Sequence, residues 1–190
     1  MRRQIPAAAA LAAALLATAA AAAPKPAVHK PAAAKPATDA PAAAPAPTGP
    51  FDARNPDYLI ALLAGMQAQA TVAERQDDTV SLKVVNPAYG FSAQFAGCDP
   101  HGRVCKALAF SGLSEQRTVT LAEINRFNQT TINCHAFMDN GGKPHAWYST
   151  LVFESTTRAD MITHIQAWQG CWATFGAFLK SPTDYLSAAP

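Results

Sequence analysis

Four cysteines are the residues of this chain whose spacing points most clearly to chemistry. Cys98 and Cys105 enclose the turn sequence Asp99-Pro100-His101-Gly102, so the strands on either side would bring them to directly opposed positions. Opposed strand positions can meet disulfide geometry, and we predict that this pair is bonded. Cys134 is expected on the inward side of a later strand and Cys171 on the inner side of the last helix. A Cys134–Cys171 bridge is therefore a second prediction, with two buried free thiols as its alternative.

Metal binding and redox catalysis are the rival uses of these side chains. A zinc site would combine Cys98, Cys105 and Cys134 with His135. A Cys-x6-Cys spacing is not that of a zinc knuckle, however, and His135 should point away from Cys134 on a strand. A dithiol redox site favours Cys-x-x-Cys, which is absent from the sequence. We therefore predict stabilising disulfides, no metal site and no cofactor.

The five histidines do not form a recognisable catalytic motif. His29 lies in a low-complexity N-terminal segment, and the others are scattered over the rest of the chain: His101, His135, His145 and His164. The sequence contains no Gly-x-Ser-x-Gly, His-Glu-x-x-His or phosphate-binding glycine loop. We predict no catalytic residue. The alternative is an envelope hydrolase, which requires a histidine such as His135 or His145 within hydrogen-bonding reach of Asp, Glu or Ser.

The N-terminal 50 residues predict export. Residues 1–23 begin with Arg2 and Arg3, continue as an apolar Ala/Leu stretch and end in small residues, as a cleavable signal peptide does. Residues 24–50 repeat Pro, Ala and Lys, which is typical of a disordered spacer because proline breaks helices and no large apolar side chain can build a core. Cleavage would leave no stable membrane span and a periplasmic or secreted protein, in an oxidising compartment that permits disulfides.

Residues 51–190 then form a single domain whose charge differs from that of the whole chain. The leading 50 residues hold five basic residues and one acidic residue, a balance of +4. Because the full chain carries +2, the domain carries 2 − 4 = −2. An acidic domain without a basic face does not suit nucleic acid.

Periodicity and turn signals predict an α+β domain. Helices are expected over residues 56–67, from Thr120 and from near Thr157, since capping residues precede helically spaced apolar side chains. Strands are expected between them, at residues 70–75, 79–85, 90–98, 104–112, 132–139 and 143–153. This order predicts a twisted antiparallel sheet of about five strands with flanking helices: helix, three or four strands, helix, two strands, helix.

Strand parity predicts which side chains face the core. Pairing Cys98 with Cys105 places apolar and mostly bulky residues on one face of the first hairpin (Phe91, Ala93, Phe95, Leu108 and Phe110) and small or polar ones on the other (Ser92, Gln94, Ala96, Ala107, Ala109 and Ser111). A two-residue Asn140-Gly141 turn would place Ile132, Cys134, Ala136 and Met138 of the second hairpin on one face with Trp147, Leu151 and Phe153. Trp147, Trp168 and Trp172 are then expected to fill the core, and a ligand pocket lined by them is the alternative. The small-residue face is left for a partner or a second copy.

Several segments together resemble the YbjN family of bacterial sensory transduction regulators. The similar stretches are Phe95–Cys98, Cys105–Ser111, Ile124–Asn128, Ala136–Gly141 and the final helix with Trp168, in order over about residues 55–180. The resemblance implies a fold like that of type III secretion chaperones, often dimeric, and a non-enzymatic binding or regulatory role. It implies no catalytic residue. Many members are cytoplasmic, whereas this chain carries an export signal.

The sequence thus predicts an exported, non-enzymatic binding or regulatory module with a protein or peptide partner in the bacterial envelope, and a homodimer is compatible with it. The hydrolase and a structural wall-associated protein are the alternatives. The residues that bind a partner stay unknown at this point.

Overall fold

The structure is a computed structural model that describes residues 47–86, 89–115 and 119–189. The predicted signal peptide and all but the end of the predicted tether lie outside the described residues. Ten elements follow one another in the order α1 (Pro56–Gly65), β1 (Gln69–Gln76), β2 (Thr79–Val85), β3 (Gly90–Ala96), β4 (Ala107–Leu113), α2 (Leu121–Thr130), β5 (His135–Met138), β6 (Pro144–Leu151), α3 (Arg158–Lys180) and α4 (Pro182–Ala188).

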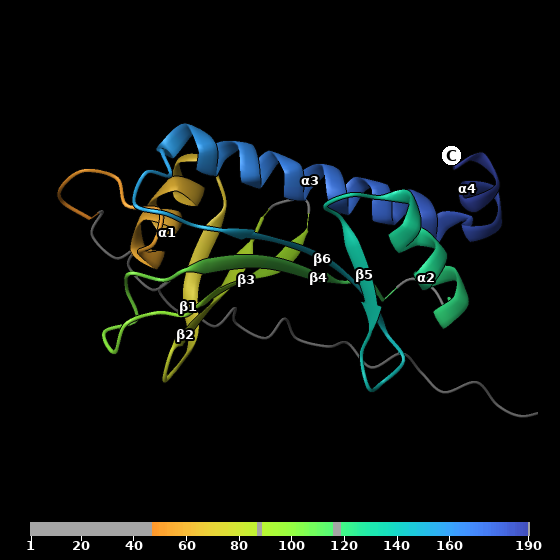
Figure 1. Cartoon of the computed structure of the whole chain (residues 1–190), viewed down its shortest axis with the longest axis horizontal. Helices are drawn as coiled ribbons and strands as arrows, with labels where there is room; N and C mark the ends of the chain where they lie inside the picture. The colour runs from red at the N-terminus through yellow and green to blue at the C-terminus, as the bar shows by residue number, and fades with distance from the viewer. Residues whose placement is uncertain (1–46, 87–88, 116–118, 190) are drawn as a thin grey trace, which may run out of the picture. The chain divides into compact units, whose positions relative to one another are not determined.

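The six strands form one antiparallel sheet in the order β1-β2-β3-β4-β6-β5. The long helix α3 runs across one face of this sheet, with α1 beside β1 and α2 beside β5 (Figure 1). The predicted α+β class and the order of helices and strands are confirmed. The sheet has six strands, which is the larger of the two totals that the predicted order allowed, and α4 is an additional C-terminal helix.

Local capping explains where the three expected helices begin. The Asn55 side chain accepts a hydrogen bond from the Asp57 N–H, and Pro56 follows it at the first helical position. Thr120 and Thr157 each form a capping box, with Glu123 and Asp160 respectively returning a hydrogen bond to the cap residue. Each box satisfies backbone N–H groups that a helix start leaves unpaired.

The register of the first hairpin is confirmed. Phe95 pairs with Leu108 and Ala93 with Phe110, which is the register predicted from the cysteine pair. All four side chains are fully buried beneath the helices. The alternating strand geometry therefore turns Ser92, Ala96 and the other small residues to the opposite face.

The register of the second hairpin was predicted wrongly by one residue. Ala136 pairs with Ala146 and His135 with Trp147, so Trp147 lies on the face opposite to Ala136. The loop is longer than a two-residue turn. The Asp139 N–H donates to the Lys143 carbonyl, and Gly142 adopts a left-handed conformation with φ 76°. A three-residue loop that ends in a left-handed glycine inserts one residue and reverses the parity of the following strand.

This shift corrects the predicted positions of several apolar residues. Trp147 is half-buried on the face of the sheet that α3 does not cover, and not in the core as predicted. Trp168 is fully buried in the core, which confirms its prediction. Leu151 is exposed for the same reason as Trp147, and Phe153 is exposed in the segment that follows β6. Ile132 is 96% exposed because β5 begins only at His135, so Ile132 belongs to the connection from α2 and not to the strand.

A close contact between β4 and α3 sets how near the helix lies to the sheet. A Cβ atom added to Gly112 would lie 2.3 Å from Cζ3 of Trp172 and 2.8 Å from its Cε3. Trp172 in turn stacks on Tyr89, with ring centroids 5.5 Å apart. Only a residue without a side chain fits at position 112.

Replacing Gly112 by alanine should therefore destabilise the fold by about 1–3 kcal/mol, because the indole must move or the helix must lift. Thermal or urea unfolding measures the loss. Gly176→Ala is the matched control, since Gly176 lies in α3 with nothing within 4 Å of the added Cβ. This control should be stabilised by up to about 1 kcal/mol through helix propensity. Equal stability of the two variants would contradict the close contact.

Candidate partner-binding face

The face of the sheet opposite α3 carries no charged residue over four neighbouring strands. We call the outward-pointing residues of β3, β4, β5 and β6 the open face. Register and parity assign them as Gly90, Ser92, Gln94, Ala96, Ala107, Ala109, Ser111, Leu113, His135, Phe137, His145, Trp147, Ser149 and Leu151. None is Lys, Arg, Asp or Glu, and most are exposed or half-buried. An uncharged, accessible face of this kind is unusual for a surface that meets only water.

Aromatic and aliphatic side chains gather at the β5–β6 side of the open face. The rings of Phe137 and His145 stack with centroids 4.7 Å apart, and Trp147 meets Phe137 edge-on at 6.1 Å. Phe137 is 40% exposed, Leu113 39% and Leu151 60%. Partly exposed aromatic side chains on a rigid strand are the residues that most often dominate the binding energy of protein interfaces.

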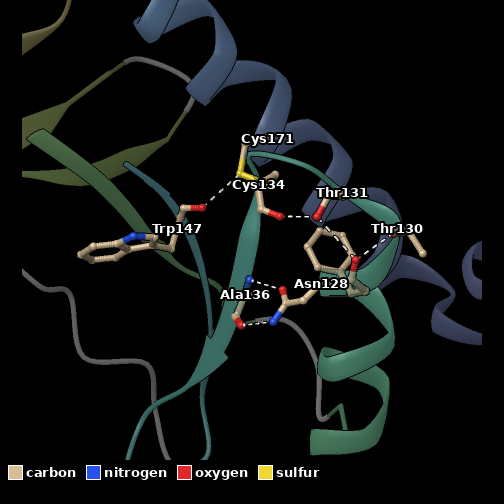
Figure 2. Close-up of a disulfide and its surroundings, with 8 residues drawn as sticks. Asn128, Thr130, Thr131, Cys134, Ala136, Trp147 and Cys171 are labelled. Atoms are coloured by element: carbon tan, nitrogen blue, oxygen red, sulfur yellow. Dashed lines mark hydrogen bonds between the residues drawn. A yellow bond between two sulfur atoms is a disulfide. The ribbon is translucent and has the colours of Figure 1, made fainter. Parts of the chain in front are cut away.

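Helix α2 closes the outer edge of β5 with a single side chain. The Asn128 amide donates from Nδ2 to the Ala136 carbonyl at 3.0 Å, and its Oδ1 accepts the Ala136 N–H at 2.7 Å (Figure 2). The side chain thus supplies both hydrogen bonds that a neighbouring strand would make. An unpaired strand edge can accept a further strand, and Asn128 occupies the hydrogen-bonding groups of β5 at Ala136. The open face, and not this edge, is therefore the accessible part of the hairpin.

Asn128→Ala should destabilise the protein by about 1–3 kcal/mol, since it leaves a backbone donor and a backbone acceptor of Ala136 without their partner. Asn125→Ala is the matched control in the same helix, because Asn125 is exposed, and it should change stability by less than about 0.5 kcal/mol. Differential scanning calorimetry compares the two. If Asn128→Ala and Asn125→Ala have the same melting temperature, the Asn128 amide does not stabilise β5.

The structure brings together each of the predicted cysteine pairs. The sulfur atoms of Cys98 and Cys105 lie 2.09 Å apart, and those of Cys134 and Cys171 lie 2.05 Å apart, which are disulfide distances. Cys134 precedes β5 directly, and its carbonyl accepts a hydrogen bond from the Thr131 hydroxyl (Figure 2). Cys171 Sγ lies 3.8 Å from the Trp147 carbonyl oxygen, while the Trp147 ring points to the other side of the sheet (Figure 2). The second pair therefore joins α3 to the hairpin that carries the aromatic residues.

The histidines are distributed over several elements, and His135 and His145 share the open face on the paired strands β5 and β6. His101 is exposed in the first turn and His135 is exposed on the open face, while the His164 Nδ1 lies 2.7 Å from the Tyr148 hydroxyl. Burial raises the pKa of Tyr148 above its ordinary value, which does not suit a proton donor or nucleophile near neutral pH. In the described part of the chain no group of three or more His, Cys, Asp or Glu residues could hold a metal ion.

His145 is the one histidine of this set that lies beside a carboxylate on the open face, with Nε2 3.3 Å from Asp139 Oδ2. The other oxygen of Asp139 accepts the N–H groups of Gly141 and Lys143, both at 2.8 Å. The Lys143 N–H bond lowers the pKa of Asp139 most, and the His145 ring acts in the same direction. The pair meets one condition of the hydrolase alternative, but these contacts give it a different task, which is to hold the β5–β6 loop and orient His145 against Phe137.

The family described as "putative bacterial sensory transduction regulator", YbjN, matches residues 55–179. The chain belongs to this family. No curated protein and no solved structure matches the chain significantly. The likeness to type III secretion chaperones therefore stays a prediction. No helix among the described residues is long and apolar enough to cross a bilayer.

The segments that resemble the YbjN family have structural tasks here. Ile124 and Phe127 are buried, and Asn128 pins Ala136. Asp139 organises the hairpin loop. The same stretches also contribute small side chains and Phe137 to the open face: Ala96, Ala107, Ala109, Ser111 and Phe137. Trp147 was predicted to fill the core and lies instead on the open face, and the Gly141-Gly142 pair was the signal for the longer loop that puts it there.

Proposed function

We propose that this YbjN-family chain is an exported, non-enzymatic regulatory module that binds a protein or peptide partner in the bacterial envelope through its open face. The observation that carries the proposal is the uncharged sheet face with Phe137 and Trp147 partly exposed on it. Burying a charge without a partner is costly, so a face without charges suits contact with another apolar surface.

Export and domain organisation belong to the same proposal. We infer residues 1–23 as a signal peptide, 24–50 as a tether and 51–190 as the folded domain, and the family match over residues 55–179 falls within that domain. Two cysteine pairs at disulfide distance support an oxidising compartment, periplasmic or secreted.

Fractionation of the bacterium followed by mass spectrometry of the intact chain tests the export half. The expected product lies outside the cytoplasm and begins after a residue between Ala17 and Ala23. A cytoplasmic chain that still contains residues 1–23 would contradict export.

Photo-crosslinking in the bacterium of origin tests the binding half. Benzoylphenylalanine placed at Phe137 should form a discrete adduct of higher mass, because this side chain would lie in the interface. Placed at Thr163, which is exposed on α3, the same group is the control and should form none. Adducts of equal yield from both positions, or none from either, would contradict binding at the open face.

A further inference from the structure

The sheet has two edge strands, β1 and β5, and their backbones are satisfied differently. At β5 the Asn128 side chain occupies both backbone groups of Ala136. At β1 no described residue outside β2 forms a hydrogen bond with the backbone of the strand. Seven of its eight residues are exposed. Within the described part of the chain, the outer edge of β1 is therefore accessible.

The C-terminal half of this edge carries two features that discourage the addition of a further strand. The register shifts between Val72 and Glu74, as in a β-bulge, and a bulge twists an edge away from regular pairing. Glu74 and Arg75 then place charges along the edge. Residues 69–72 contain no bulge, no charge and no proline. We call this unprotected stretch the β1 half-edge.

Contacts at both ends of β2 show which of its residues hydrogen-bond with β1. The Asn86 N–H donates to the Tyr89 carbonyl, and the Cys98 N–H donates to the Asp78 carbonyl. Residues 78 and 86, which flank β2, thus bond on the β3 side. Because the bonded side alternates along an antiparallel strand, even-numbered residues of β2 bond with β3 and odd-numbered residues bond with β1.

This alternation gives the direction of the backbone groups in the β1 half-edge. Lys83 is an odd-numbered residue of β2, and its partner in β1 is Thr71. Thr71 therefore hydrogen-bonds with β2. Its neighbours Ala70 and Val72 direct their N–H and C=O groups away from β2, to the outer edge.

We propose that the β1 half-edge binds an extended, uncharged peptide segment of another protein, which adds a strand beside β1. The outward N–H and C=O groups of Ala70 and Val72 match the backbone of such a segment, which we place antiparallel like every other pair in the sheet. The half-edge lies on the strand farthest from β5 and apart from the open face. The inference therefore goes beyond the proposed function and does not depend on it.

Side-chain parity indicates which segment fits. Val72 pairs with the fully buried Leu82, so the Val72 side chain lies on the face that α3 covers, where it is 39% exposed. Thr71 points to the opposite face. A segment with an apolar residue beside Val72 and a small polar residue beside Thr71 covers the exposed part of Val72. A charged residue in the segment would meet no opposite charge in residues 69–72. Alternating Val and Thr is the simplest sequence that fits.

Nuclear magnetic resonance of the chain as the cell exports it tests the inference with the peptide acetyl-Lys-Thr-Val-Thr-Val-Thr-Lys-amide. The amide signals of Ala70 and Val72 should shift, and their hydrogen exchange should slow. Ala70→Pro removes one outward N–H, which an edge strand tolerates, and should raise the dissociation constant by about tenfold or more. Ala70→Ser is the matched control, because it keeps the N–H and a small side chain, and it should retain binding.

Circular dichroism must show that Ala70→Pro is folded. The same peptide with both valine nitrogens methylated tests the hydrogen bonds without any change to the protein, and it should bind at least about tenfold more weakly. Signals of Ala70 and Val72 that stay unchanged at millimolar peptide overturn the inference. Equal binding of the methylated and unmethylated peptides also overturns it.

Photo-crosslinking in the bacterium identifies the occupant. Benzoylphenylalanine at Gln69 should form an adduct with a different protein, which Ala70→Pro removes and Ala70→Ser retains. No adduct, or an adduct of two identical chains, overturns the inference. Because Ala70→Pro leaves the open face unchanged, an adduct formed from Phe137 should persist in this variant, and failure of one proposal is thereby distinguished from failure of the other.

Discussion

Replacing Trp168 by alanine is expected to lower the free energy of unfolding by about 3–5 kcal/mol. The Trp168 side chain is fully buried, and its ring centroid lies 5.6 Å from the ring centroid of Phe91 and 6.0 Å from that of Phe110. These contacts join α3 to the centre of the sheet. Truncation leaves a cavity that neighbouring aromatic rings cannot fill without leaving their own packing. Urea unfolding measures the loss.

Two further variants show whether the effect comes from packing. Trp168→Phe should lose about 1 kcal/mol or less than that, because it keeps an aromatic ring and removes an indole N–H that has no hydrogen-bond partner among the described residues. Gln169→Ala, at the exposed neighbouring position, should stay within about 0.5 kcal/mol of the unmodified protein. A loss as large in Gln169→Ala would mean that helix α3, and not the Trp168 contact, is the sensitive element.

Removal of the Cys134–Cys171 pair by a double alanine substitution should destabilise the protein by about 4 kcal/mol in the chain-entropy treatment. The two residues are 37 positions apart, and the covalent bond restricts the unfolded chain over that whole loop. Cys98 and Cys105 are only 7 positions apart, so their double alanine variant should lose about 2.5 kcal/mol. Unfolding in urea under oxidising conditions gives both values.

Excess reductant provides the control for this comparison. When all sulfur pairs are reduced, the unmodified protein and the Cys134/Cys171 variant should unfold at nearly the same urea concentration. Alkylation of the exported protein in denaturant, before any reduction, should find no free thiol. Four free thiols in that experiment would show that neither bond forms in the cell.

Part of this fold could be predicted because its determinants are local. Asn55, Thr120 and Thr157 start helices by hydrogen bonds to residues two or three positions away, and such contacts are visible in a short window of sequence. The register of the first hairpin could also be predicted from the sequence, because the cysteine spacing and the alternation of large and small residues indicate the same register.

The second hairpin could not be predicted in the same way. Its apolar residues allow either parity, since Trp147 and Tyr148 are both large and adjacent. The choice depends on whether Gly142 takes a left-handed conformation, which the Asp139 contacts to Gly141 and Lys143 favour. One inserted residue then moves Trp147 from the expected core to the surface. The contact of Asn128 with Ala136 was missed for a related reason, because it joins a helix to a strand edge.

By itself, the sequence determined the α+β class, the order of the helices and strands, the family and the small side chains of the β3–β4 half of the open face. These follow from capping, alternation and motif order, which act over a few residues. Only the tertiary structure decided that Phe137 and Trp147 join those small residues on one accessible face. The open face depends on a loop conformation, on strand neighbours and on α3 covering the opposite side of the sheet, and each of these is fixed by packing between segments far apart in the chain.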